Sequence, residues 1–259
     1  MIRSIWFVVY AVTIFLLYDI LLRIGHIFAS DRGEELSFRL ADDLMRRLFL
    51  ILRRIGGFRF IYENHPDVGL PERFLVVANH QSLLDIIVAI TYFGSCRRVR
   101  LVSKRELGRF VPLVSSVLRI QGHALISRKG DAKQAMDELA RFSRLCAERG
   151  VSPVIFPEGT RSGTGTVGVF HSAGVRRILE EGGSLPVVAL AIDGGWKVRN
   201  IQGLLKNLRE GKYRVRLAGV FPAPTGKKEI LDVLARTRAC ISEIVEDWHL
   251  SDKALDPGV

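Results

Sequence analysis

The chain from Gly57 onward alternates between runs rich in β-branched and aromatic residues and segments with helical spacing. Alternation of this kind predicts an α/β domain with a mixed, largely parallel sheet flanked by helices. The predicted strands are mostly apolar, which fits burial on both faces of the sheet. They are residues 58–62, 74–78, 99–102, 124–127, 151–156, 185–192 and 213–220. The predicted helices are residues 84–93, 131–149, 173–182 and 227–249.

The amino-terminal segment has a different character. From residue 5 to residue 22 every side chain is apolar or weakly polar except Asp19. Eighteen helical residues reach about 27 Å, close to the roughly 30 Å hydrocarbon core of a bilayer. Asp19 lies near the end, where a charge costs less than at the centre, and no signal-peptide cleavage site follows. We expect a membrane-binding helix that spans the bilayer or lies in one leaflet; a buried core helix is the alternative.

The next segment has the pattern of a basic amphipathic helix. Leucine or isoleucine recurs at positions 36, 40, 44, 48, 51, 52 and 55, and arginine and aspartate fill most polar positions. Such a helix either lies at a membrane interface, with its arginines toward anionic headgroups, or packs on the domain as an ordinary helix. If the first helix spans, Arg23, Arg32 and Arg39 outnumber Arg3 and place the large domain in the cytoplasm.

Charge and cysteine content narrow the function classes. The net charge of +11 suits nucleic acid, an anionic membrane surface or phosphorylated substrates. The basic residues are dispersed and accompany no nucleic-acid-binding motif, which argues against nucleic acid. Cys96, Cys146 and Cys240 have neither the number of a disulfide framework nor the spacing of a zinc site, so we expect a reduced, cytoplasm-facing domain. No G-x-S-x-G sequence suggests a serine hydrolase.

The first candidate site is N-H-Q-S-L-L-D at residues 79–85, between a predicted strand and a predicted helix. In one continuous helix, residues five apart point about 140° from each other. His80 and Asp85 can therefore meet only if the motif straddles the loop and the first helical turn. Asp85 would then accept a hydrogen bond from one imidazole nitrogen while the other faces a substrate hydroxyl, as in a general base. The other interpretation is a capping box at residues 82–85, with His80 hydrogen-bonded in a turn.

The second candidate site is F-P-E-G-T-R-S at residues 156–162, directly after a buried-looking strand. Ligand sites of α/β sheets commonly form at such strand ends. Gly159 permits close approach of the backbone, Arg161 can hold a phosphate with two parallel hydrogen bonds, and Thr160 or Ser162 can add a hydroxyl donor. Glu158 cannot attract phosphate and would orient Arg161 or bind a substrate hydroxyl. The alternative is a polar turn with a structural Glu-Arg pair.

Together these segments resemble the glycerolipid acyltransferase family, and specifically bacterial 1-acyl-sn-glycerol-3-phosphate acyltransferases. The likeness covers most of the chain and keeps the order and spacing of four sequence blocks. The first block is N-H-x-S-x-x-D at residues 79–85, and the third is F-P-E-G-T-R-S at residues 156–162. K-R-E-L at 104–107, Pro112 and G-H-A-L-I-S-R at 122–128 resemble the second, and L-P-V-V-A-L at 185–190 resembles the fourth.

The resemblance implies a role for each matching residue. His80 would take the proton from an acceptor hydroxyl that attacks an acyl thioester directly, and Asp85 would orient and stabilise His80. Arg161, with Arg128 and Lys104, would hold the phosphate of lysophosphatidic acid, while Glu158, Gly159 and Thr160 would belong to the substrate site. No metal or cofactor is implied; the co-substrate is acyl-CoA or acyl-acyl carrier protein.

The resemblance also predicts the organisation of the chain. Residues 1–56 would form a membrane-associated helical segment, 57–250 the catalytic domain and 251–259 a loose tail. The expected location is the inner (cytoplasmic) membrane, with the catalytic domain facing the cytoplasm. Many relatives have Phe-Lys-x-Gly after the third block, whereas this chain has Phe170-His171-Ser172-Ala173-Gly174. Acceptors other than lysophosphatidic acid, such as an amino-acid-containing lysolipid, therefore stay open, as does a non-catalytic protein that binds lipid at the membrane surface.

Overall fold

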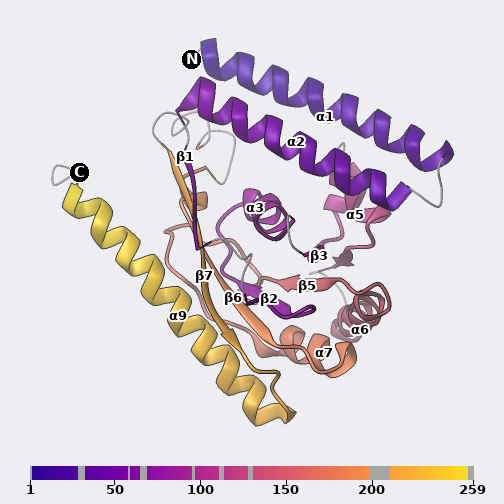
Figure 1. The fold of residues 1–259 in the computed structure, drawn as a ribbon, viewed down its shortest axis with the longest axis vertical. Helices are drawn as coiled ribbons and strands as arrows, with labels where there is room; N and C mark the ends of the chain where they lie inside the picture. Colours follow the sequence, from indigo (N-terminus) through magenta and orange to yellow (C-terminus); the bar gives the residue numbers. More distant parts are fainter. Residues whose placement is uncertain are drawn as a thin grey trace.

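The computed structural model describes residues 2–28, 33–57, 59–64, 69–94, 97–110, 114–127, 131–198, 203 and 211–255. Within them lies one seven-stranded sheet with the order β1-β7-β6-β2-β5-β3-β4 (Figure 1). Its strands are β1 Arg59–Glu63, β2 Leu75–Ala78, β3 Val99–Lys104, β4 Ala124–Ile126, β5 Ser152–Ile155, β6 Val187–Asp193 and β7 Lys212–Phe221. β6 pairs with β7 in antiparallel fashion, and every other neighbouring pair is parallel. The predicted mixed, largely parallel sheet is confirmed.

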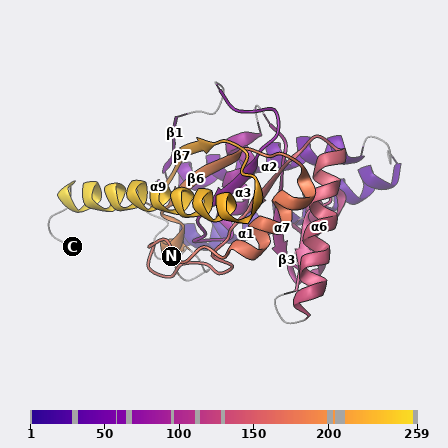
Figure 2. The same ribbon diagram turned by 90° about the horizontal axis from the view of Figure 1, so that it is seen from below.

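The central strands are buried on both faces, so their alternate residues join two separate cores. Val76 and Ala78 of β2 pack in the core that includes α3 (Leu84–Phe93). Leu75 and Val77 of the same strand pack in the core on the opposite face. That face is covered by α6 (Ala132–Glu148), α7 (Ser172–Gly182) and α9 (Gly226–Leu255) (Figure 2).

Two parts of the expected helix content need correction. Three short helices were not predicted: α4 (Leu107–Phe110), α5 (Val114–Ile120) and the 3-10 helix η1 (Gly195–Val198). The tail predicted to begin at residue 251 is helical as far as Leu255, because α9 continues through it. Asp252, within this extension, forms ion pairs with Lys212 at 3.0 Å and with Arg214, which fasten the end of α9 to β7.

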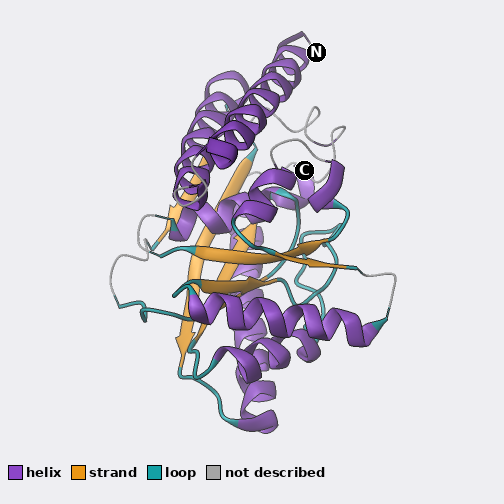
Figure 3. Ribbon diagram, turned by 90° about the vertical axis from the view of Figure 1, so that its right-hand side faces the viewer, coloured by secondary structure: helices purple, strands orange, loops and turns teal. Residues whose placement is uncertain are grey.

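The amino-terminal segment forms two helices, α1 (Ile2–Phe28) and α2 (Gly33–Gly56), that lie against each other on the α3 side of the sheet (Figures 1 and 3). Tyr18 and Leu22 of α1 and Leu44 of α2 are buried in the core on that side. The opposite face of α1 exposes large apolar side chains from Trp6 to Ile27, so α1 is not a buried core helix. Within the described residues, no helix combines the length and apolarity that a membrane crossing requires. Membrane binding by this pair stays a prediction.

Candidate active site

His80 and Asp85 meet at the carboxyl end of β2. β2 ends at Ala78 and α3 begins at Leu84, so the intervening loop carries His80 and the first helical turn carries Asp85. The Nδ1 atom of His80 lies 2.7 Å from Oδ2 of Asp85. The Asp85 side chain is fully buried, and that of His80 is 10% exposed. The predicted placement, with His80 in the loop and Asp85 in the first helical turn, therefore brings the two side chains together.

The surroundings of Asp85 indicate which nitrogen of His80 carries a proton. Oδ2 of Asp85 also accepts hydrogen bonds from the backbone N–H groups of Gln81 at 2.6 Å and Ser82 at 2.8 Å. An oxygen that accepts from two donors favours a third donor at Nδ1, which leaves the lone pair of the neutral imidazole on Nε2. The same carboxylate therefore holds both the loop before α3 and the histidine. Of the predicted capping box, the bond from the Ser82 N–H is present, whereas Leu83 at the helix start has no side-chain capping hydrogen bond.

A tyrosine that sequence reasoning missed completes the surroundings of the carboxylate. The hydroxyl of Tyr213, on β7, donates to Oδ1 of Asp85. Burial, followed by the charge of Asp85, raises the pKa of Tyr213 well above its ordinary value, so the phenol remains a donor. Tyr213 is 128 residues from Asp85 in sequence, and no local pattern could have signalled the contact.

Two amides next to His80 hold the loop against β6 and η1. The side chain of Asn79 donates to the carbonyl of Ile192 and accepts from its N–H, each at 2.8 Å, so it continues the sheet pairing beyond the end of β2. Oε1 of Gln81 accepts from the N–H of Gly195 at 3.0 Å. These bonds fix the backbone on both sides of His80. Asn79 belongs to the first sequence block, but neither residue was given a role from the sequence.

The turn after β5 contacts the same loop. Ser162 N–H donates to the carbonyl of His80 at 2.7 Å, and the ring of Phe156 stacks on the imidazole with a centroid distance of 4.4 Å. Gly159 has a φ of 65°, a conformation that favours glycine. The two sequence motifs, far apart in the chain, therefore form one site.

The structure gives Glu158 a different position from the substrate contact expected for it. Oε1 accepts from the N–H of His80 at 2.9 Å, and Oε2 accepts from the N–H of Gly168 at 3.1 Å. Its carboxyl is buried, which raises its pKa, and it is absent from the lining of the adjacent cavity. Glu158 thus holds the loop that carries His80, because both oxygens already have backbone partners.

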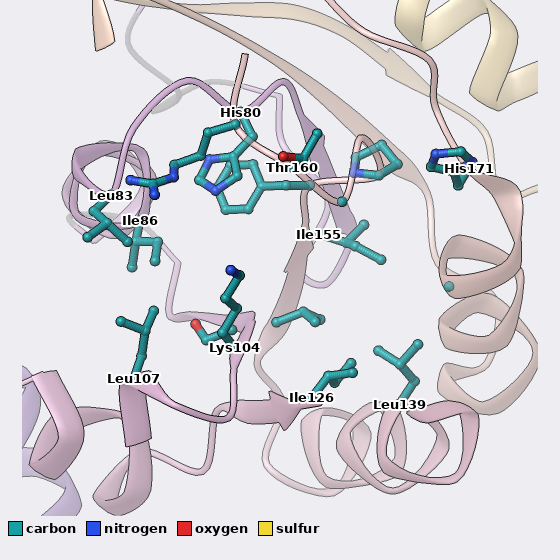
Figure 4. A pocket seen from close by; sticks show the side chains of 17 residues that line it. His80, Leu83, Ile86, Lys104, Leu107, Ile126, Leu139, Ile155, Thr160 and His171 are labelled. Atoms are coloured by element: carbon teal, nitrogen blue, oxygen red, sulfur yellow. The ribbon is translucent and has the colours of Figure 1, made fainter. Parts of the chain in front are cut away.

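A cavity of about 720 Å³ opens beside His80 (Figure 4). Its polar lining includes Lys104, Thr160 and Arg161, and Figure 4 shows Lys104 pointing from the end of β3 toward His80. Arg128, the other predicted phosphate ligand, lies outside the described residues. His171 also lines the cavity. The remaining lining is largely apolar and includes Leu83, Ile86, Val102, Leu107, Ile126, Leu139 and Ile155.

This arrangement can deprotonate a hydroxyl and hold an anion on a molecule with an apolar chain. Nδ1 of His80 is bound to the buried Asp85, so Nε2 is the nitrogen left for a substrate proton. Lys104 and Arg161 bring positive charge to the same cavity, and the apolar walls suit an alkyl chain. Among the described residues, no group of three or more His, Cys, Asp or Glu side chains could hold a metal ion.

Comparisons with known proteins identify one family. The family model described as Acyltransferase matches residues 59–193, which contain both motifs. A 1-acyl-sn-glycerol-3-phosphate acyltransferase of Helicobacter pylori is 31% identical over 185 residues, 69% of each chain. An enzyme of the same name from Borreliella burgdorferi is 26% identical over 163 residues, 63% of each chain.

A solved structure shares the fold over nearly the whole chain. The 1-acyl-sn-glycerophosphate (LPA) acyltransferase of Thermotoga maritima superposes with a TM-score of 0.74, covering 96% of this chain and 95% of that one, at 20% identity. In sequence, the similarity extends over 53% to 69% of the length of the bacterial relatives named 1-acyl-sn-glycerol-3-phosphate acyltransferase, including that of Pseudomonas aeruginosa.

Proposed function

The chain belongs to the Acyltransferase family, and we propose that it transfers an acyl chain from an acyl thioester to the sn-2 hydroxyl of 1-acyl-glycerol-3-phosphate, giving phosphatidic acid for phospholipid synthesis. The observation that carries the proposal is the His80–Asp85 pair at the edge of a cavity that combines cations with apolar walls. The relatives named for this reaction support the choice of substrate.

The proposed reaction uses the lone pair on Nε2 of His80, which is available because Nδ1 donates a hydrogen bond to Asp85. Nε2 of His80 takes the proton of the acceptor hydroxyl as its oxygen attacks the thioester carbonyl. The carbon–sulfur bond then breaks, and the imidazolium returns the proton to the departing thiolate of coenzyme A or acyl carrier protein. Asp85 stabilises the transient imidazolium from 2.7 Å, while Tyr213 fixes the far oxygen of Asp85.

The cavity supplies the contacts that position both substrates. Lys104 and Arg161 bind the acceptor phosphate, and Arg128 is proposed as a further cation at the same group. Thr160 and the backbone at Gly159 lie beside the glycerol. The apolar walls around Ile126 and Leu139 receive an acyl chain, since burial of each CH₂ contributes about 0.8 kcal/mol.

Membrane attachment of the helix pair brings the lipid acceptor to the cavity. The exposed face of α1 carries large apolar side chains, and a continuous apolar surface of this kind is typical of a membrane contact. We place α1 in one leaflet of the inner membrane, with the α/β domain on the cytoplasmic side. The exposed apolar residues are Trp6, Val9, Tyr10, Val12, Leu16, Leu17, Ile20, Leu21, Ile24 and Ile27.

His171 favours testing a second acceptor lipid beside lysophosphatidic acid. His171 lines the cavity at the position where many relatives have lysine, so the site carries less fixed positive charge. A lysolipid with less phosphate character, such as an amino-acid-containing lysolipid, would suit that difference.

The test offers the purified protein labelled acyl-CoA and acyl-acyl carrier protein with lysophosphatidic acid and competing lysolipids, and identifies products by mass spectrometry. His80→Ala should lower turnover by about 10² to 10⁴ fold, the usual contribution of a positioned general base. Urea unfolding of the same variant checks that it remains folded. A folded His80→Ala protein with near-normal turnover would refute the assignment of the base. Wild-type protein that binds lysolipid but transfers no acyl group would instead indicate a non-catalytic lipid-binding protein.

A further inference from the structure

A second cavity, of about 550 Å³, lies at the end of α1 and shares no lining residue with the cavity at His80. It is enclosed by the last turns of α1 and by α4 and α5. Its lining is strongly basic and partly apolar, and includes Arg23, His26, Ile27, Arg109, Arg119 and Ile120.

The positive charge of this second cavity is only partly compensated. Arg23 forms an ion pair with the buried Asp19 at 2.9 Å, and Oδ1 of Asp19 also accepts from the hydroxyl of Ser116. No carboxylate among the described residues forms an ion pair with Arg109 or Arg119. Within the described part of the chain, these two guanidinium groups face one concavity without a carboxylate partner, which favours an anion. Arginine binds phosphate oxygens with two parallel hydrogen bonds.

The apolar surroundings of the cavity indicate what the anion is attached to. Ile27 lines the cavity and is 73% exposed, and Ile24 and Ile20, one and two turns back along α1, are about half exposed. An alkyl chain that leaves the cavity would therefore run along an apolar ridge. Inorganic phosphate or a nucleotide would leave that ridge uncovered, whereas a phospholipid would cover it.

We infer that the second cavity is a binding site for the phosphate headgroup of an anionic membrane phospholipid, held by Arg109 and Arg119 with its acyl chains along Ile27, Ile24 and Ile20. The site is separate from the proposed acceptor site, because the two cavities share no lining residue. α4 borders both cavities: Leu107 lines the first and Arg109 the second. The hydroxyl of Ser115 donates to the carbonyl of Leu107 at 2.9 Å, so α5 and α4 are joined between the two cavities.

The test measures binding of dihexanoyl phosphatidylglycerol below its micelle concentration to the full-length protein by calorimetry. Wild-type protein should bind one molecule saturably, and Arg109→Gln/Arg119→Gln should bind it at least about tenfold more weakly. The matched control, Arg141→Gln/Arg236→Gln, also removes two positive charges, but from exposed positions on α6 and α9. It should bind the lipid like wild type. Dihexanoyl phosphatidylcholine should bind at least about tenfold more weakly than the glycerol lipid, because its headgroup carries no net charge.

Three outcomes would overturn the inference. The first is that the control variant binds phosphatidylglycerol as weakly as Arg109→Gln/Arg119→Gln does. The second is that phosphatidylcholine binds as tightly as phosphatidylglycerol. The third is that inorganic phosphate or coenzyme A displaces phosphatidylglycerol with an affinity equal to that of the lipid. The catalytic proposal is judged separately, since Arg109→Gln/Arg119→Gln should retain acyl transfer to a detergent-dispersed acceptor. Loss of lipid binding with retained turnover would thus support the second site, and loss of turnover in His80→Ala concerns only the first.

Discussion

Gly195→Ala adds a single methyl group beside the His80–Asp85 pair. A Cβ at this position would lie 2.7 Å from the hydroxyl oxygen of Tyr213 and 3.0 Å from Oδ1 of Asp85. Ordinary van der Waals contact begins near 3.4 Å, so these atoms must move by about 0.7 Å and 0.4 Å. The φ angle of Gly195 is not positive, so alanine can adopt its backbone conformation. Only the close contacts of the new methyl group disfavour the substitution.

The displacement should act on turnover more than on binding. Overpacking of a buried site costs about 1–3 kcal/mol of stability, which a folded domain can tolerate. A misplacement of about 1 Å at reacting groups can cost about 10² in rate, so shifts of this size should lower kcat by about 10 to 100 fold. KM should change less, since Lys104 and Arg161, the proposed phosphate contacts, lie on β3 and on the turn after β5.

Initial rates at saturating acyl donor, together with urea unfolding curves, test this expectation. The control is Gly219→Ala on β7, where a Cβ would meet its nearest neighbour, the ring of Phe221, at 3.4 Å. The control should keep both rate and stability close to wild type. A folded Gly195→Ala protein with wild-type kcat would refute the claim that the Tyr213–Asp85 contact fixes the catalytic geometry.

Two further predictions concern the buried His123 and the cavity residue Arg161. Burial, followed by the charge of Arg100, lowers the pKa of His123 to about 3. In the folded protein Nδ1 of His123 accepts a hydrogen bond from the N–H of Leu101. Near pH 6, therefore, His123 takes up a second ring proton only in the unfolded chain. The free energy of unfolding should therefore fall by about 1.4 kcal/mol per pH unit below pH 6.5, or about 2 kcal/mol by pH 5. Urea titrations should show a smaller pH dependence in His123→Gln, and an unchanged dependence would contradict the assignment. Arg161→Gln should raise KM for lysophosphatidic acid by about 10 to 100 fold and leave that for uncharged monoacylglycerol nearly unchanged, as loss of hydrogen bonds to a charged group implies. Equal changes for both acceptors in steady-state assays would count against a phosphate contact.

The sheet could be predicted from sequence because the central strands β2, β5 and β6 are mostly apolar runs, and β7 alternates apolar and basic residues over its first half. α4 and α5 could not, because four and seven residues are too few to display a helical period. The end of α9 was missed for another reason. Its last turn is polar and is held by ion pairs of Asp252 to β7, which depend on tertiary structure rather than on a local pattern.

The candidate site was predictable only where its contacts are local. His80 and Asp85 are five residues apart, so a strand-to-helix placement was enough to bring them together. Tyr213 reaches Asp85 through the sheet order β7-β6-β2, which is set by pairing between distant segments. Glu158 was predicted from its place in a polar motif to orient Arg161 or contact substrate, whereas its bonds to the backbone N–H groups of His80 and Gly168 depend on tertiary structure and had no local signal.

The contacts around His80 divide the site into a fixed part and an exposed part. The N–H of His80 is bound by Glu158 and its carbonyl by Ser162, so the turn after β5 holds the catalytic loop from both sides. Thr160 and Arg161, in the same turn, are exposed and line the cavity. Because the backbone of this turn fixes the base while its exposed side chains face the acceptor, those side chains can change without displacing His80. Substitution of Thr160 or Arg161 should therefore change which ligands the cavity holds, while the position of His80 stays the same.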